Sequence, residues 1–183
     1  MRSGTKTAVA EKLFLLEPTA ELEDEFMDMV AEYRRAHDDH YRNVPEMERR
    51  NFRAYVRRLQ NEARGIGLQA GRVSATTFWL VREDGRVLGE SRLRHQLTPF
   101  LRHEGGHIGY SIRISERRKG YGTRLLGLVL EKARQIGLRR VLVTCDTENT
   151  ASARVIQKNG GRIEDEVISK TSGKRVSRYW ITL

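Results

Sequence analysis

The part of this sequence that most constrains its fold is the stretch from His107 to Val143, where two apolar periodicities follow each other. Apolar or aromatic residues at positions 108, 110, 112 and 114 alternate with others and predict a strand over His107–Ile114. Apolar residues then recur every three or four positions from Leu125 to Ile136, which predicts a helix ending at Gly137. Val141–Val143 predicts a short buried strand, so the chain must accommodate strand, loop, helix and strand in succession.

The loop of this unit, Arg117-Arg118-Lys119-Gly120-Tyr121-Gly122-Thr123, has the properties of a phosphate site. Its two glycines allow tight, left-handed backbone and close approach to a ligand. Because a helix begins directly after it, free N–H groups and the positive end of the helix dipole attract anions. A Walker loop is excluded because Lys119 precedes Gly120, and a dinucleotide fingerprint is disfavoured because Leu125 replaces its third glycine. A turn of basic surface residues is the alternative to a phosphate site.

Size and composition indicate one domain with an anionic partner. The chain has 183 residues, of which 38% are hydrophobic, and a formal net charge of +10. We expect a flexible tail over 1–10 and a single domain over 11–183. A phosphorylated cofactor, an anionic surface or nucleic acid would suit the charge, but the arginines are spread along the whole chain, which disfavours nucleic acid.

Cysteine usage and the N-terminus favour a cytoplasmic protein. Cys145 is the only cysteine, so no intrachain disulfide can form. One thiol and scattered histidines do not make a zinc site, and we expect no metal. We expect neither a signal peptide nor a membrane span, because the first ten residues are polar and no apolar run approaches about 20 residues.

The remaining elements complete an alternating pattern. Lys12–Leu16 predicts a strand, and two amphipathic segments carrying Phe26 and Phe52 predict helices. Thr76–Val81 and Arg86–Leu93 flank Asp84-Gly85 and predict a hairpin. Asn149 is a good N-cap for a helix through Lys158, and a final hairpin follows over Ile163–Ile168 and Arg175–Ile181. The predicted order is β-α-α-β-β-β-α-β-α-β-β, in the α/β to α+β range.

Two motifs at the expected separation resemble the GNAT superfamily of N-acetyltransferases. Arg117, Gly120 and Gly122 fall on the fixed positions of the Q/R-x-x-G-x-G/A signature. Asn149 to Val155 resembles the N-x-x-S/A-x-x-V/L segment of the next helix, and Lys158 to Gly161 is similar to its K-x-G-F ending. The resemblance, strongest from about residue 76 to 183, points to a group of bacterial members.

This resemblance implies a GNAT fold, with a mixed, mostly antiparallel central sheet and helices on both faces. It also implies transfer of an acetyl group from acetyl-CoA to a primary amine by direct attack in a ternary complex. The backbone N–H groups of residues 118 to 123 would hold the CoA pyrophosphate, with Arg117 as the signature position and the Thr123 hydroxyl adding a hydrogen bond. The pantetheine arm would lie beside the backbone of Ile112 and Ile114, and Asn149 and Ser152 would contact it. The cofactor-binding residues expected in this way are Ile112, Ile114, Arg117, Arg118, Lys119, Gly120, Tyr121, Gly122, Thr123, Asn149 and Ser152.

The catalytic groups implied by the resemblance are less sharply defined. A common base position near the start of the strand before the loop is His107, with His95, His103 and Glu90 as alternatives. Ile156 stands where many relatives have a tyrosine, so Ser152 is the candidate acid. We expect the backbone N–H of Ile112 to stabilise the oxyanion.

Several alternatives stay open at this stage. His107 and Ser152 suit structural hydrogen bonding as well as catalysis. We expect Cys145 to be a buried structural thiol and Asp146 a cap for the following turn. His37 and His40 are candidate acceptor contacts. The missing tyrosine keeps open a CoA-binding regulatory module without turnover, and a homodimer and the identity of the amine are also open.

Overall fold

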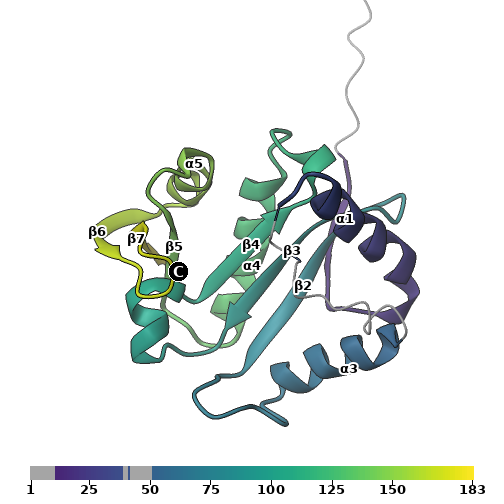
Figure 1. Ribbon diagram of the computed structural model, residues 1–183, viewed down its shortest axis with the longest axis horizontal. Coiled ribbons are helices and arrows are strands. Elements are labelled where there is room, and N and C mark those ends of the chain that lie inside the picture. Colours follow the sequence, from purple (N-terminus) through teal and green to yellow (C-terminus); the bar gives the residue numbers. More distant parts are fainter. Residues whose placement is uncertain (1–10, 39–40, 42–50) are drawn as a thin grey trace, which may run out of the picture.

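A seven-stranded sheet in the order β1-β2-β3-β4-β5-β7-β6 forms the centre of the molecule (Figure 1). The computed structural model describes residues 11–38, 41 and 51–183. The strands are β1 Leu13–Leu16, β2 Ala75–Arg82, β3 Val87–Arg94, β4 Ile108–Ile112, β5 Arg140–Asp146, β6 Arg162–Ile168 and β7 Arg175–Thr182. The helices are α1 Glu23–Arg35, α3 Phe52–Ala63, α4 Tyr121–Gln135 and α5 Thr150–Lys158, with short helical turns at Ala20–Leu22, Leu101–Gly105 and Ile114–Glu116. The predicted element order is confirmed.

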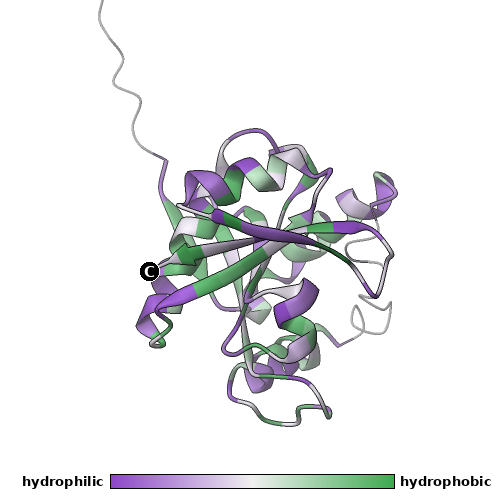
Figure 2. Cartoon of the chain, turned by 90° about the vertical axis from the view of Figure 1, so that its left-hand side faces the viewer, coloured by the Kyte–Doolittle hydropathy of each residue, from purple (hydrophilic) through white to green (hydrophobic). Residues whose placement is uncertain are grey.

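Helices cover both faces of the sheet because the strands are apolar on both sides. One core joins α4 and α5 to the face that carries Leu80 and Leu88. The other joins α1 and α3 to the opposite face through a stack of Phe26 on Trp79, with ring centroids 4.7 Å apart. Figure 2 shows hydrophobic and hydrophilic segments alternating along the helices, as expected when one face of each is buried. No helix in the described ranges is long and apolar enough to cross a membrane.

The sheet opens between β4 and β5, its one parallel pair. These strands pair in register at Ile108 and Val143, whereas the neighbouring pairs β3–β4 and β5–β7 run in register over most of their length. Beyond Ile108 the main chain of β4 is therefore unpaired on the β5 side. This opening lies at the centre of the strand–loop–helix–strand unit.

Strand β4 ends at Ile112, two residues before the predicted end at Ile114. Ile114 instead begins a helical turn, in which the Arg117 N–H donates to the Ile114 carbonyl at 3.3 Å. The turn is anchored by Arg113, whose fully buried side chain donates to carboxylates of α1. These are Glu25, Asp28 and Glu32. Such pairing is needed because an unpaired buried guanidinium would be strongly destabilising.

Candidate active site

The loop before α4 presents a row of free amides. None of the backbone N–H groups of residues 118–122 donates a hydrogen bond to an acceptor in the described part of the chain. The Thr123 and Arg124 N–H groups do have a partner, the Gly120 carbonyl, at 3.1 and 3.3 Å. The predicted cradle of residues 118 to 123 is thus one residue shorter at its C-terminal end. Five consecutive donors at a helix N-terminus suit a polyanionic ligand.

The two glycines of the loop serve different purposes. Gly120 has φ 88° and open space around it, so the backbone conformation alone favours glycine there. Gly122 has ordinary φ, but a Cβ at this position would lie 3.3 Å from Cγ2 of Val155 on α5. Gly122 therefore permits close packing of α4 against α5. Arg118 also has positive φ, 64°, which turns the loop toward the helix.

Two of the three cationic side chains of the loop, Arg117 and Lys119, bind neighbouring protein groups. Arg117 lies over the ring of Tyr33 and donates to Asp38 at 2.9 Å and to the Ile112 carbonyl at 3.2 Å. Lys119 donates to Glu116 at 2.8 Å. Arg117 thus ties the loop to the end of α1.

The main chain of β4 directs polar groups into the opening toward β5. In an antiparallel pair, alternate residues exchange main-chain hydrogen bonds with the partner strand. Here these are the odd-numbered residues, since Arg94 N donates to His107 O at 2.7 Å and Arg113 N to Leu88 O at 2.9 Å. Tyr110 and Ile112 consequently point their N–H groups toward β5. Ile114 lies outside the strand and does not continue this row.

A cavity of about 490 Å³ lies where β4 and β5 separate. It brings together Ser152 and Asn149, which were predicted from the sequence, with Cys145, Asp146 and Glu90. It is further lined by Ser91, Arg92, Arg94, Ile108, Gly109, Tyr110 and Thr144. His107, Ile112, Ile114 and the loop 117–123 do not line it. The phosphate loop and this cavity are therefore separate parts of the site. The cavity lies beside β4, and the loop follows β4 in the chain.

Asn149 and Ser152 form the start of α5 at the cavity wall. Asn149 Oδ1 accepts from the Ser152 N–H at 3.0 Å, which confirms Asn149 as the N-cap. The Ser152 hydroxyl lies 2.9 Å from the Tyr110 hydroxyl. Burial raises the pKa of Tyr110 to about 12, so this hydroxyl keeps its proton at neutral pH.

Tyr110 was identified from the sequence as a strand residue without a functional role. Strand alternation places it on the same face as Ile108 and Ile112, the face covered by α4 and α5. The Tyr110 hydroxyl, on the face that α4 and α5 cover, was the signal in the sequence that could have identified it.

Glu90 is the acidic group of the opposite wall. It lies on β3 beside Trp79, whose Nε1–H donates to Glu90 Oε2 at 3.0 Å. Burial raises the pKa of Glu90 to about 7, although the Trp79 hydrogen bond and the charges of Arg92 and Arg58 oppose this shift. Glu90 therefore exchanges a proton near neutral pH at the edge of the cavity.

His107 occupies a buried position at the junction of β4 and β5. Its Nδ1 accepts from the Leu142 N–H at 2.9 Å, so the proton of the neutral ring sits on Nε2. Burial, together with the charges of Arg94 and Arg102, lowers the pKa of His107 to about 4. A neutral imidazole with its lone pair engaged does not fit the predicted role of general base, and the hydrogen bond to β5 indicates a structural role.

The other candidate histidines within the described residues do not line the cavity. The His95 Nε2 lies 2.9 Å from the Thr76 hydroxyl, and the His103 Nε2 lies 3.0 Å from the Ile168 carbonyl. His37 follows α1 with φ 51° and is exposed, while His40 is outside the described residues. Burial raises the pKa of the Cys145 thiol, which disfavours a thiolate nucleophile. Within the described ranges, no three His, Cys, Asp or Glu side chains gather as a metal site would require.

Comparison with known proteins agrees with this geometry. The family model described as an acetyltransferase (GNAT) domain matches residues 12–162. That range contains the phosphate loop, the opening between β4 and β5, and both walls of the cavity. A search of curated protein sequences gives no match.

Solved acetyltransferase structures share the fold over almost the whole chain. RimL, the ribosomal L7/L12 alpha-N-protein acetyltransferase in complex with coenzyme A, aligns with a TM-score of 0.70 at 17% identity, over 93% of this chain and 94% of that chain. The Microcin C7 self immunity acetyltransferase MccE, in complex with acetyl-CoA and AMP, gives 0.70 at 13% identity, over 96% and 94%. The Salmonella typhimurium acetyl transferase that modifies the N-terminal serine of the 50S ribosomal subunit protein L7/L12 gives 0.63 at 16% identity, over 93% and 95%. At these identities the likeness shows the fold alone, whereas the family model covers most of the chain, and the protein belongs to the GNAT acetyltransferases and is an acyltransferase.

Proposed function

We propose that this protein transfers an acetyl group from acetyl-CoA to a primary amine by direct attack in a ternary complex. The observation that carries the proposal is the cavity at the opening of the sheet. It has a carboxyl group that titrates near neutral pH on one wall and a pair of protonated hydroxyls on the other. A base and an acid on opposite sides of one cavity are what amine acylation requires.

The loop supports acetyl-CoA as the donor. The free amides of residues 118–122 suit the pyrophosphate, and the unpaired edge of β4 suits an extended amide-containing arm beside it. Asn149 lines the cavity toward which that arm would run. Bound acetyl-CoA would supply the activated acetyl group. CoA or acetyl-CoA accompanies RimL and MccE in their structures.

Glu90 is the proposed base. With a pKa of about 7 it is substantially ionised at neutral pH and still basic enough to take a proton from an amine, directly or through one water. His107 was the first candidate from the sequence, but its engaged Nδ1 and lowered pKa favour Glu90. Asp146 at the end of β5 adds a second carboxylate to the same cavity.

The Tyr110–Ser152 pair is the proposed proton donor. The Tyr110 hydroxyl remains protonated at neutral pH, and its contact with Ser152 places two hydroxyls at the start of α5. This arrangement compensates for Ile156, which stands where many relatives have a tyrosine. The Ile112 N–H points into the opening and is the proposed donor to the acetyl oxygen.

The test is thiol release from acetyl-CoA across a panel of amines, with CoA affinity measured separately by calorimetry. Release that depends on one class of amine supports the proposed function. Tight CoA binding without release from any amine would instead support a regulatory or sensor module. Weak binding of CoA would contradict both.

A further inference from the structure

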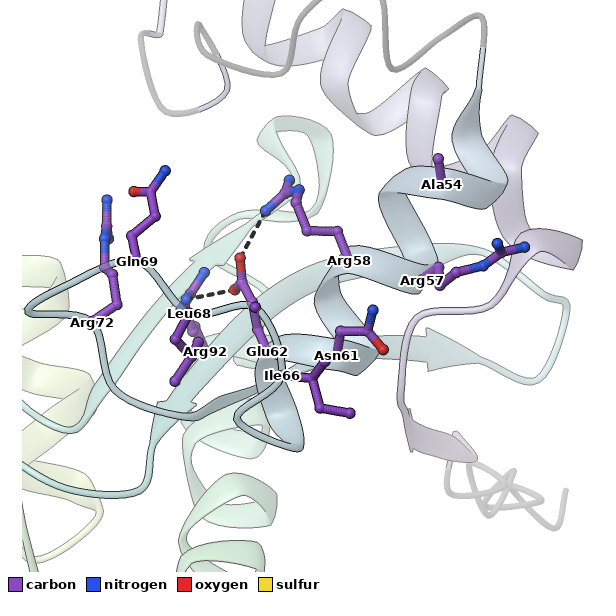
Figure 3. Close-up of a pocket in the computed structure, with 11 residues that line it drawn as sticks. Ala54, Arg57, Arg58, Asn61, Glu62, Ile66, Leu68, Gln69, Arg72 and Arg92 are labelled. Carbon is purple, nitrogen blue, oxygen red and sulfur yellow. Dashed lines mark hydrogen bonds and ion pairs between the residues drawn. The ribbon is translucent and has the colours of Figure 1, made fainter.

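A second cavity, also of about 490 Å³, adjoins the first and has four arginines in its lining (Figure 3). It lies between the C-terminal half of α3, the loop after it and β3. Arg92 lines both cavities and so connects them. Figure 3 shows Arg72 and Gln69 on the loop opposite Arg58 on α3, with Arg92 and Glu62 between them. We call this the arginine cavity.

Among the described residues that line the arginine cavity, positive charge exceeds negative charge. Its lining residues include four arginines, Arg57, Arg58, Arg72 and Arg92, and one carboxylate, Glu62. Glu62 already accepts from Arg58 at 2.9 Å and from Arg92 at 2.7 Å. The Arg72 side chain has no hydrogen bond or ion pair with any of the described residues. The contact with Glu62 leaves N–H donors on Arg92, because a guanidinium has five N–H groups.

The positive field extends to the first cavity. The pKa of Arg94 is lowered to about 10, first by burial and then by the charges of Arg92 and Arg72. Arg94 itself donates to the Gly105 and Gly106 carbonyls at 2.9 and 3.2 Å. An arginine whose charged form is disfavoured by two other arginines indicates a region where positive charge is not compensated.

Glu90 is a carboxyl group on the same strand as Arg92. Glu90 and Arg92 are two residues apart on β3, so both side chains lie on the same face of the sheet. A ligand lying along that face would meet a carboxylate at the sheet opening and guanidinium groups farther out. Such an arrangement complements a molecule with an amine at one end and an anion at the other.

We propose that the acceptor is an anionic amine, whose carboxylate or phosphate group binds Arg72 and Arg92 while its amine faces Glu90. This inference rests on the proposed function and adds the chemical class of the acceptor. Guanidinium groups bind carboxylates and phosphates through paired, charge-assisted hydrogen bonds, which neutral or cationic tails cannot make. Polyamines are disfavoured because their second ammonium group would enter the positive cavity.

The test compares acceptors that differ in tail charge alone. One arm uses short peptides with a free α-amine and either glutamate or glutamine at the following positions. A second arm uses phosphoethanolamine against ethanolamine, which separates a small phosphorylated amine from an acidic peptide. In at least one arm we expect the anionic acceptor to have a kcat/KM at least about tenfold higher, with the preference shrinking as salt increases.

Charge reversal at Arg72 assigns the preference to the cavity. Arg72→Glu should lower kcat/KM for the anionic acceptor by about tenfold and leave the neutral one within about twofold. The matched control is Arg134→Glu, which makes the same charge change at an exposed position on α4, on the other face of the sheet. Equal effects of the two variants, a higher kcat/KM for neutral or polycationic acceptors, or no charge preference in either arm would overturn the proposal.

A binding measurement separates this proposal from the proposed function. Calorimetry with an N-acetylated glutamate peptide and, separately, with phosphoethanolamine requires no turnover. Binding of either probe that is weakened by Arg72→Glu and not by Arg134→Glu supports an anion site even in a protein without transferase activity. Transfer to amines without any such binding or preference would retain the proposed function and reject the anionic acceptor.

Discussion

The phosphate loop and the acceptor side of the cavity are built in different ways. The loop offers backbone groups: five free amides held in place by Gly120 and by packing at Gly122. The acceptor side works through side chains, with Glu90 and Arg92 on β3 facing Arg58 on α3. The two regions share β4 as a common wall. The proposed donor groups are therefore local in sequence, whereas the proposed acceptor groups lie on separate elements of the chain.

The difference has a consequence for substitution. Backbone donors are lost when the main-chain conformation changes, so a single glycine controls several hydrogen bonds. Side-chain groups can be removed one at a time, and each removal should affect one property of the reaction. Substitutions in the loop and in the acceptor side should therefore have different effects.

The largest effect is expected for Gly120→Val. A β-branched residue at φ 88° costs about 1–2 kcal/mol and would shift the loop away from its present path. Loss of two or three charge-assisted hydrogen bonds predicts a roughly thousandfold weaker binding of acetyl-CoA, measured by calorimetry.

Gly137→Val is the matched control at the other end of the same helix. Gly137 has φ 87° and, like Gly120, no heavy atom within 4 Å of an added Cβ. Both variants should lose similar stability, but only Gly120→Val should lose affinity for acetyl-CoA. Equal affinities in the two variants would remove the loop from the donor site.

Glu90→Gln should have the next largest effect, on turnover. Removing a general base predicts a loss of roughly a hundredfold in kcat, with CoA affinity unchanged. The wild-type rate should rise with pH through about 7 as Glu90 ionises, and the variant should lack this rise. A variant with the wild-type pH–rate profile would exclude Glu90 as the base.

Ionisation of Glu90 should also lower the free energy of unfolding of the protein. Its folded pKa of about 7 lies above the ordinary value of 4.5, so the folded state binds more protons between these two pH values. The free energy of unfolding of the wild type should therefore fall as pH rises from about 4.5 to 7. Glu90→Gln should remove this decline and be more stable at pH 9 by up to about 3 kcal/mol in urea unfolding.

Replacing the hydroxyl pair should have smaller effects on transfer. Tyr110→Phe removes the proposed donor and predicts a roughly tenfold lower kcat with little change in KM for acetyl-CoA. Ser152→Ala retains the tyrosine and should slow transfer less. A higher KM with unchanged kcat would make either hydroxyl a binding group, in which case the proton donor lies elsewhere.

The contrast between the two regions explains what the sequence could predict. The element order and the phosphate loop follow from local periodicity and glycine placement, so both could be read from neighbouring residues. The end of β4 was placed at Ile114 because Ile112 and Ile114 continue the alternation. The buried contacts of Arg113 with three carboxylates of α1 are long-range, and local periodicity carries no information about them.

The acceptor side was harder to predict for the same reason. Glu90 was an alternative, but its raised pKa depends on burial beside Trp79, which the fold creates. The arginine cavity joins α3, the following loop and β3, so its arginines are separated in the sequence and indistinguishable there from other surface arginines. His107 had the expected position for a base, yet its ring is turned toward β5.

His107→Gln should have the smallest effect on turnover and a clear effect on acid stability. The folded pKa of about 4 lies below the ordinary 6.5, so the unfolded state binds more protons between these values. The free energy of unfolding of the wild type should therefore fall as pH drops from about 6.5 to 4, by up to about 3 kcal/mol. The variant should lose this pH dependence and keep kcat within a few-fold of the wild type. A large loss of kcat that recovers at high pH would instead identify His107 as the base.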